Sequence, residues 1–97
     1  MKVAELADVE VLRKLAPPAA YDWGVEASNR GDVEVRAEEP QRVAARVTDD
    51  PPHDVELRSD EDVLQWTCTC DDADPSLCRH GVAAAVETWR RSPPPVV

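Results

Sequence analysis

All three cysteines of the chain and one of its two histidines lie in one short segment, CTCDDADPSLCRH, at residues 68–80. The spacing is Cys68-x-Cys70-x7-Cys78-x-His80. Three thiolates and one imidazole form a ligand set of closed structural zinc sites, which place four donors tetrahedrally. The histidine favours zinc over iron or an iron–sulfur cluster. The segment therefore predicts one structural Zn²⁺ ion.

Other chemistries fit the same segment less well. An odd number of cysteines fits poorly with a disulfide framework, and the plainest alternative is a buried cluster of reduced cysteines beside an unrelated histidine. A redox role for Cys68 and Cys70 would need a free thiolate of low pKa, and zinc would take both thiolates. A zinc enzyme keeps one coordination position open for water, and four protein ligands leave none. We therefore expect no enzyme and no catalytic residues.

Composition limits the remaining classes of function. The 97 residues allow one domain with a small core, and the chain has no phenylalanine. Its net charge of −9 argues against non-specific binding to nucleic acid or anionic membranes. No apolar run is long enough to span a bilayer, and acidic residues in the N-terminal segment argue against a signal peptide. A cytoplasmic protein is expected, and clustered cysteines there more often bind metal than form disulfides.

The elements that must position the cluster can be predicted from the hydrophobic pattern. Apolar residues recur every three to four positions over residues 3–15, which indicates a helix. Pro17 and Pro18 end it, because the residue before a proline avoids helical backbone. Residues 19–31 indicate only a short helical turn or an irregular bridge, and the sequence NRGD at residues 29–32 indicates a turn.

Three or four strands follow. Apolar and polar residues alternate in short runs near residues 33–37, 42–47, 54–58 and 64–68, and turn residues separate the runs at Pro40, 49–52 and 59–62. This pattern is typical of an antiparallel meander with one face in solvent. The last strand ends at the first two cysteines, so both would point to one side.

A second helix is predicted from His80 to Arg91, with an apolar stripe along it and Asp74 or Ser76 as its N-cap. The prolines at residues 93–95 stop it. The apolar stripe of this helix consists of Val82, Ala85 or Val86, and Trp89. One domain over residues 1–92 and a disordered tail over residues 93–97 are expected.

The cluster and its flanks resemble the SWIM zinc finger family, in which a strand leads into C-x-C and C-x-H precedes an Ala/Val-rich helix. The matching residues read LQWTCTC from Leu64 and LCRHGVAA from Leu77, although the proline usual after the second cysteine is replaced by Asp71. The resemblance is specific across residues 63–89 and implies a stand-alone prokaryotic form. It implies that Cys68, Cys70, Cys78 and His80 bind zinc in a ββα core. It also implies a DNA-binding or protein-interaction module without catalytic activity.

Two groups of side chains outside the cluster could also carry function. Trp66 and Trp89 could stack on nucleic-acid bases, but we expect them in the core. His53 follows two prolines and is expected to be exposed and inert. The candidate nucleic-acid surface is a stripe of arginines, namely Arg42, Arg46 and Arg58, together with Arg79, Arg90 and Arg91. Acidic residues, Glu34, Asp54 and Glu56, are interleaved with the stripe. We therefore interpret this surface as a mixed, solvated face.

These observations predict an α+β fold with an N-terminal helix, a small antiparallel meander and a C-terminal strand–zinc knuckle–helix. The function they favour is a zinc-binding interaction module that acts as a protein–protein adaptor. A nucleic-acid-binding accessory factor is the alternative, and a zinc enzyme is a third. No membrane and no small-molecule substrate is expected.

Overall fold

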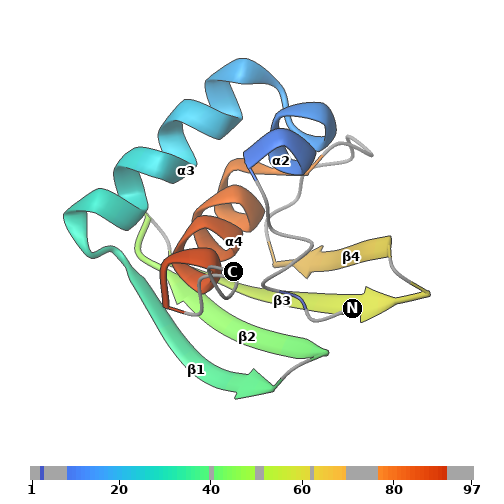
Figure 1. The fold of residues 1–97 in the computed structure, drawn as a ribbon. Helices are drawn as coiled ribbons and strands as arrows, with labels where there is room; N and C mark the ends of the chain where they lie inside the picture. The colour runs from blue at the N-terminus through green and yellow to red at the C-terminus, as the bar shows by residue number, and fades with distance from the viewer. Residues whose placement is uncertain are drawn as a thin grey trace.

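The computed structural model describes Val3 and residues 9–39, 41–49, 52–61, 63–69 and 77–91. In this part of the chain the elements follow the predicted α+β order of N-terminal helix, antiparallel strands and C-terminal helix (Figure 1). Its helices and strands are α2 (Val9–Leu15), α3 (Pro18–Arg30), β1 (Val33–Glu39), β2 (Arg42–Val47), β3 (His53–Asp60), β4 (Val63–Cys68) and α4 (Arg79–Arg91).

The four strands form one sheet in the order β1-β2-β3-β4, and each neighbouring pair is antiparallel, as the meander prediction requires. Val43 and Ala45 of β2 are buried, and they pair with Leu57 and Val55 of β3, which are buried as well. The charged or small residues that alternate with these four along β2 and β3 lie on the opposite face of the sheet. One face of the sheet therefore packs against the helices, and the other faces solvent (Figure 1).

Strand β3 is longer at both ends than the sequence pattern predicted. The turn expected over residues 59–62 is shorter, because Asp60 still pairs with Val63. Glu61 has a positive φ of 50°, which tight two-residue hairpins require. At the other end His53 is the first residue of the strand and does not lie in the turn.

Helix α3 differs most from the sequence expectation. The prediction of a short turn or an irregular bridge over residues 19–31 was wrong, because a regular helix runs from Pro18 to Arg30. Pro17 follows the end of α2, and Pro18 begins α3 at a position where a missing N–H costs nothing. Gly31 then closes the helix with a left-handed φ of 79°, and its N–H donates to the Ser28 carbonyl over 3.1 Å.

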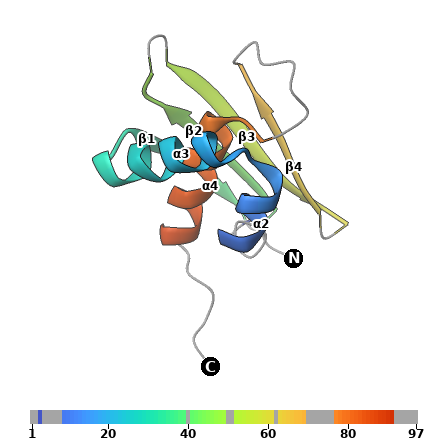
Figure 2. The same cartoon turned by 90° about the horizontal axis from the view of Figure 1, so that it is seen from above.

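Helix α4 lies between α3 and the sheet and is buried on nearly every side (Figures 1 and 2). The predicted apolar stripe was therefore too narrow. Ala83 and Ala84 are fully buried, and small side chains let the two helices approach closely. A Cβ atom built at Gly24 of α3 would lie only 2.4 Å from Cγ1 of Val82. This close approach brings α3 beside the start of α4, where the histidine of the cluster lies.

The predicted N-terminal helix is confirmed where the chain is described. Val3 is helical and buried, α2 ends at Leu15 as expected, and residues 4–8 lie outside the described residues. The Leu77 N–H donates to the Leu15 carbonyl over 2.9 Å, which ties α2 to the chain entering α4. Residues 70–76 and the predicted tail also lie outside the description. Among the described helices, none combines the length and the apolar character that crossing a bilayer requires.

Candidate metal centre

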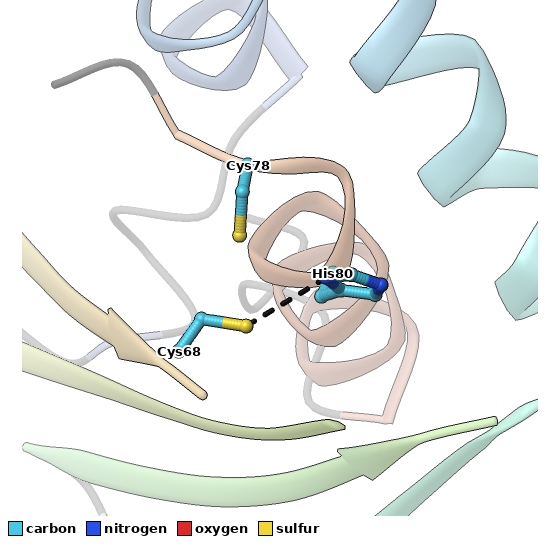
Figure 3. Close-up of side chains that lie close together, drawn as sticks. All are labelled: Cys68, Cys78 and His80. Carbon is cyan, nitrogen blue, oxygen red and sulfur yellow. Dashed lines mark hydrogen bonds between the residues drawn. The ribbon is translucent and has the colours of Figure 1, made fainter. Parts of the chain in front are cut away.

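Three of the four predicted zinc ligands lie together. Cys68 is the last residue of β4, Cys78 comes directly before α4, and His80 is in the first turn of that helix. Their ligand atoms, two Sγ and one imidazole nitrogen, all lie within 4.8 Å of one another. Figure 3 shows the three side chains converging between the strand end and the helix. The fold therefore brings Cys68 at the strand end together with Cys78 and His80 at the helix start.

One separation within this cluster can be compared with the edge of a tetrahedral zinc site. The Cys68 Sγ atom lies 3.7 Å from Nδ1 of His80. Zn–S and Zn–N bonds of about 2.3 Å and 2.1 Å at a tetrahedral angle would place sulfur and nitrogen about 3.6 Å apart. The Cys68–His80 separation thus matches the edge of a zinc tetrahedron. Cys70, the fourth predicted ligand, lies outside the described residues, and so does Asp71 beside it.

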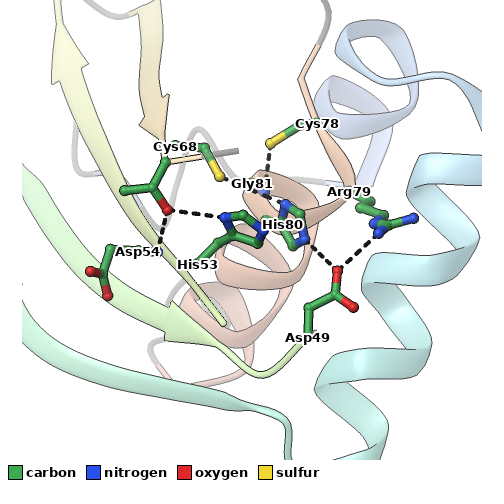
Figure 4. A network of polar contacts seen from close by, with 9 residues as sticks. Asp49, His53, Asp54, Cys68, Cys78, Arg79, His80 and Gly81 are labelled. Carbon is green, nitrogen blue, oxygen red and sulfur yellow. Dashed lines mark hydrogen bonds and ion pairs between the residues drawn. The ribbon is translucent and has the colours of Figure 1, made fainter. Parts of the chain in front are cut away.

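A carboxylate contacts the imidazole of His80 on the side of the ring away from the two cysteines. Its Nε2 lies 2.8 Å from Oδ2 of Asp49, in the connection between β2 and β3. Arg79 Nη2 donates to the same oxygen over 2.9 Å. An ionised carboxylate only accepts, so a neutral imidazole in this contact carries its proton on Nε2 and has its lone pair on Nδ1, on the side of Cys68. Figure 4 shows Asp49 on one side of the ring and the two sulfurs on the other.

Two aromatic side chains enclose the same ring. The edge-to-face partner is Trp23 of α3, with centroids 5.5 Å apart, and the tilted partner is His53, with centroids 4.4 Å apart. The expectation that His53 is exposed and inert was wrong. It is half-buried, and its Nδ1 lies 3.1 Å from Oγ1 of Thr69. His80 itself is 4% exposed, so the predicted ligand lies inside the fold.

The start of α4 is built around the second cysteine of the cluster. The Cys78 carbonyl accepts from the Val82 N–H over 2.9 Å, and its Sγ accepts from the Gly81 N–H over 3.4 Å. Cys78 therefore acts as the N-cap. Asp74 and Ser76, the caps expected from the sequence, lie outside the described residues. A thiolate at Cys78 suits this position, since helix N-termini favour negative charge.

The predicted arginine stripe lies on the solvent face of the sheet and is neutralised by carboxylates, as the sequence indicated. Arg42 pairs with Glu56 over 3.0 Å, and Arg58 pairs with the same side chain over 3.1 Å. The Glu56 carboxylate, as acceptor and neighbouring charge, raises the pKa of Arg42 above its ordinary value. Arg46 lies 3.8 Å from Asp54. The prediction of a mixed face is therefore confirmed.

The remaining arginines of that set are also engaged within the chain. Arg79 contacts the carboxylate behind His80, and its guanidinium lies 4.9 Å from the centre of the Trp23 ring. Arg90 donates to Ser28 and to the Asn29 side chain of α3. Arg91 lies 3.5 Å from Glu38. Trp66 and Trp89 pack against the core, as expected.

A strand end and a helix start that hold clustered cysteine and histidine side chains define a zinc finger. The SWIM zinc finger family model matches residues 49–87 of the chain. The match confirms the resemblance found in the sequence and identifies a zinc-binding module with a structural zinc ion. No curated protein and no solved structure matches the chain.

The sequence reasoning missed the residues that surround His80. Asp49 was interpreted only as a turn residue, and Trp23 lies in the segment of residues 19–31, which was expected to be a short turn or an irregular bridge. No spacing rule connects either of them to the cysteine cluster. Their roles depend on the sheet register, which puts the β2–β3 connection beside α4, and on the packing of α3.

Proposed function

We propose that Cys68, Cys70, Cys78 and His80 bind one structural Zn²⁺ ion and that the module serves as a protein–protein adaptor. The donors at residues 68, 78 and 80 support this ligand set by their mutual distances. Cys70 is two positions beyond Cys68, so its thiol is within the same short segment as that ligand. Four protein donors complete a tetrahedral zinc shell and leave no position for a reacting water, which argues against catalysis.

The pairing of the arginines is the observation that carries the choice of protein over nucleic acid. Binding to a nucleic-acid backbone needs cationic side chains that neutralise phosphates and so release the counterions condensed on the nucleic acid. Each of the six arginines of the candidate nucleic-acid surface lies within 4 Å of a carboxylate or hydroxyl oxygen of the chain, although Nε of Arg46 makes no hydrogen bond within the described part of the chain. The net charge of −9 adds long-range repulsion toward a phosphate backbone. A protein partner does not face this barrier. We place the module in the cytoplasm, where thiols stay reduced and free to bind zinc.

A fluorescence-anisotropy titration tests this choice. Zinc-loaded protein is added to labelled single- and double-stranded DNA at roughly 50 mM and 200 mM salt, where phosphate contacts change most. We expect no binding at the lower salt. Micromolar binding that weakens steeply at the higher salt would contradict the adaptor function and support a nucleic-acid-binding accessory factor.

The adaptor function itself is tested by affinity capture. The zinc-loaded chain and the Cys78→Ser variant are immobilised in parallel and exposed to the same cytoplasmic extract. We expect proteins that bind the zinc-loaded chain and not the variant, because the variant lacks one proposed ligand. Equal capture by both would contradict a function that depends on the zinc-stabilised fold.

A further inference from the structure

The contacts behind His80 form a closed cycle that extends beyond the cysteine cluster. Asp49 accepts from His80 over 2.8 Å and from Arg79 over 2.9 Å. The Arg79 guanidinium lies 4.9 Å from the centre of the Trp23 ring, and the Trp23 ring lies 5.5 Å from the His80 ring. The cycle joins three segments, namely the β2–β3 connection, the first turn of α4 and helix α3. Figure 4 shows its polar part.

Two features of this cycle bear on metal binding. First, the carboxylate of Asp49 at Nε2 leaves the unprotonated Nδ1 on the side of Cys68, 3.7 Å from Sγ. Such a carboxylate behind a metal-binding histidine fixes both the tautomer and the ring orientation. Second, Asp49 is itself held by Arg79, whose side chain is half-exposed while that of Asp49 is 21% exposed. In the folded chain the carboxylate is therefore held by contacts with both Arg79 and His80.

Helix α3 supplies no ligand, yet it lies against the site. Trp23 contacts both His80 and Arg79, and it belongs to a helix outside the matched segment of residues 49–87. The α3–α4 contact is also close, because Gly24 has no room for even one more carbon atom beside Val82. A change in the orientation of the His80 ring would therefore change the packing of α3.

We propose that Asp49 is a positioning residue that selects Nδ1 of His80 for zinc, and that the cycle Asp49–Arg79–Trp23–His80 couples zinc binding to the packing of α3. The inference rests on the proposed role of His80 as a ligand. It extends the functional unit from the zinc finger segment to the preceding helix. Zinc affinity then depends on side chains that never contact the ion.

The direct test is the nitrogen-15 NMR spectrum of the two His80 ring nitrogens in the zinc-loaded chain. We expect Nδ1 to show the metal-bound shift and Nε2 to carry a slowly exchanging proton. A spectrum with Nε2 bound to zinc overturns the inference even if every variant fails to fold. If His80 binds no metal at all, the proposed ligand set fails instead, so the two failures can be told apart.

Three variants test the role of Asp49, with zinc affinity measured by competition against a chelator. Asp49→Ala should weaken zinc binding by about 10–100-fold, the usual effect of removing such a partner. Asp49→Asn keeps an acceptor oxygen and should fall between Asp49→Ala and the unmodified chain. Asp54→Asn is the matched control, because this exposed carboxylate makes its ion pair with Arg46 on the opposite sheet face. Equal affinities for Asp49→Ala and the control would overturn the inference.

Coupling to α3 is tested by hydrogen exchange of residues 18–30 in zinc-loaded protein. At saturating zinc, Asp49→Ala should speed exchange in these residues relative to the Asp54→Asn control. This readout separates coupling from a simple loss of affinity, because zinc occupancy is the same in both samples. Unchanged exchange across α3 would show that the helix packs independently of the site.

Discussion

The Sγ atom of Cys68 lies 3.7 Å from Nδ1 of His80, although 12 positions separate the two residues in the chain. The first is the end of the last strand and the second is in the first turn of the last helix. A metal bound between them would link the sheet directly to α4, which is the most buried helix of the fold. The zinc site and the hydrophobic core therefore stabilise the same arrangement.

Removal of zinc should abolish cooperative folding. Structural zinc in small domains supplies roughly 10–16 kcal/mol of apparent binding free energy. A whole domain typically has a net free energy of unfolding of about 5–15 kcal/mol. We therefore expect EDTA to eliminate the thermal unfolding transition seen by circular dichroism, and added zinc to restore it. A metal-free sample that keeps the full transition would contradict a structural role for the ion.

Substitution of Cys70 should be as damaging as substitution of Cys68 or Cys78. If all four residues bind zinc, each Cys→Ser change removes one thiolate donor and lowers zinc affinity to a similar extent. Competition with a chelator measures the affinity, and the absorption spectrum of the cobalt-loaded protein reports the number of thiolates. Thr67→Ser, on an exposed position of β4, serves as the control. Unchanged affinity in Cys70→Ser would mean that another group supplies the fourth ligand.

The strands and the cysteine cluster could be predicted because their signals are local. Alternation along β2 and β3 shows which residues face the core, and a histidine two positions after Cys78 falls on the first helical turn. Because the predicted turns between the strands are short, each strand must pair with the next one along the chain, which gives an antiparallel meander. Residues close in sequence carry this information by themselves.

The surroundings of His80 could not be predicted because they depend on packing between distant segments. Asp49 lies in a run of acidic residues and prolines whose composition indicates only a turn. Its contact with His80 follows from the β2–β3 register and from the depth at which α4 is buried. Helix α3 was missed for a different reason, since Pro18 was interpreted as a helix end and its second role as a helix start was overlooked.

His53 should contribute to stability without binding zinc. His53→Ala removes the ring contact with His80 and the hydrogen-bonding contact with Thr69. Such contacts are each worth roughly 0.5–1.5 kcal/mol, so we expect a loss of about 1–2 kcal/mol in urea unfolding of the zinc-loaded protein. Zinc should still bind one to one, as measured by metal analysis after dialysis. Loss of bound zinc in this variant would identify His53 as a ligand.

Gly24→Ala should destabilise the protein although alanine is the better helix former. The added Cβ would lie 2.4 Å from Val82 Cγ1 and 2.7 Å from the Ala83 backbone nitrogen, so α3 and α4 must move apart. Overpacking of this kind costs about 1–3 kcal/mol, which exceeds the gain in helix propensity of up to about 1 kcal/mol.

Urea unfolding at fixed zinc measures the change in stability, and Asp22→Ala on the exposed side of α3 provides the control, with an expected effect within about 0.5 kcal/mol. A Gly24→Ala variant more stable than the unmodified chain would show that propensity outweighs packing and that α3 can retreat from α4. Because Trp23 precedes Gly24 directly and contacts His80, the same variant should also weaken zinc binding. Unchanged zinc affinity together with lower stability would place the strain away from the metal centre.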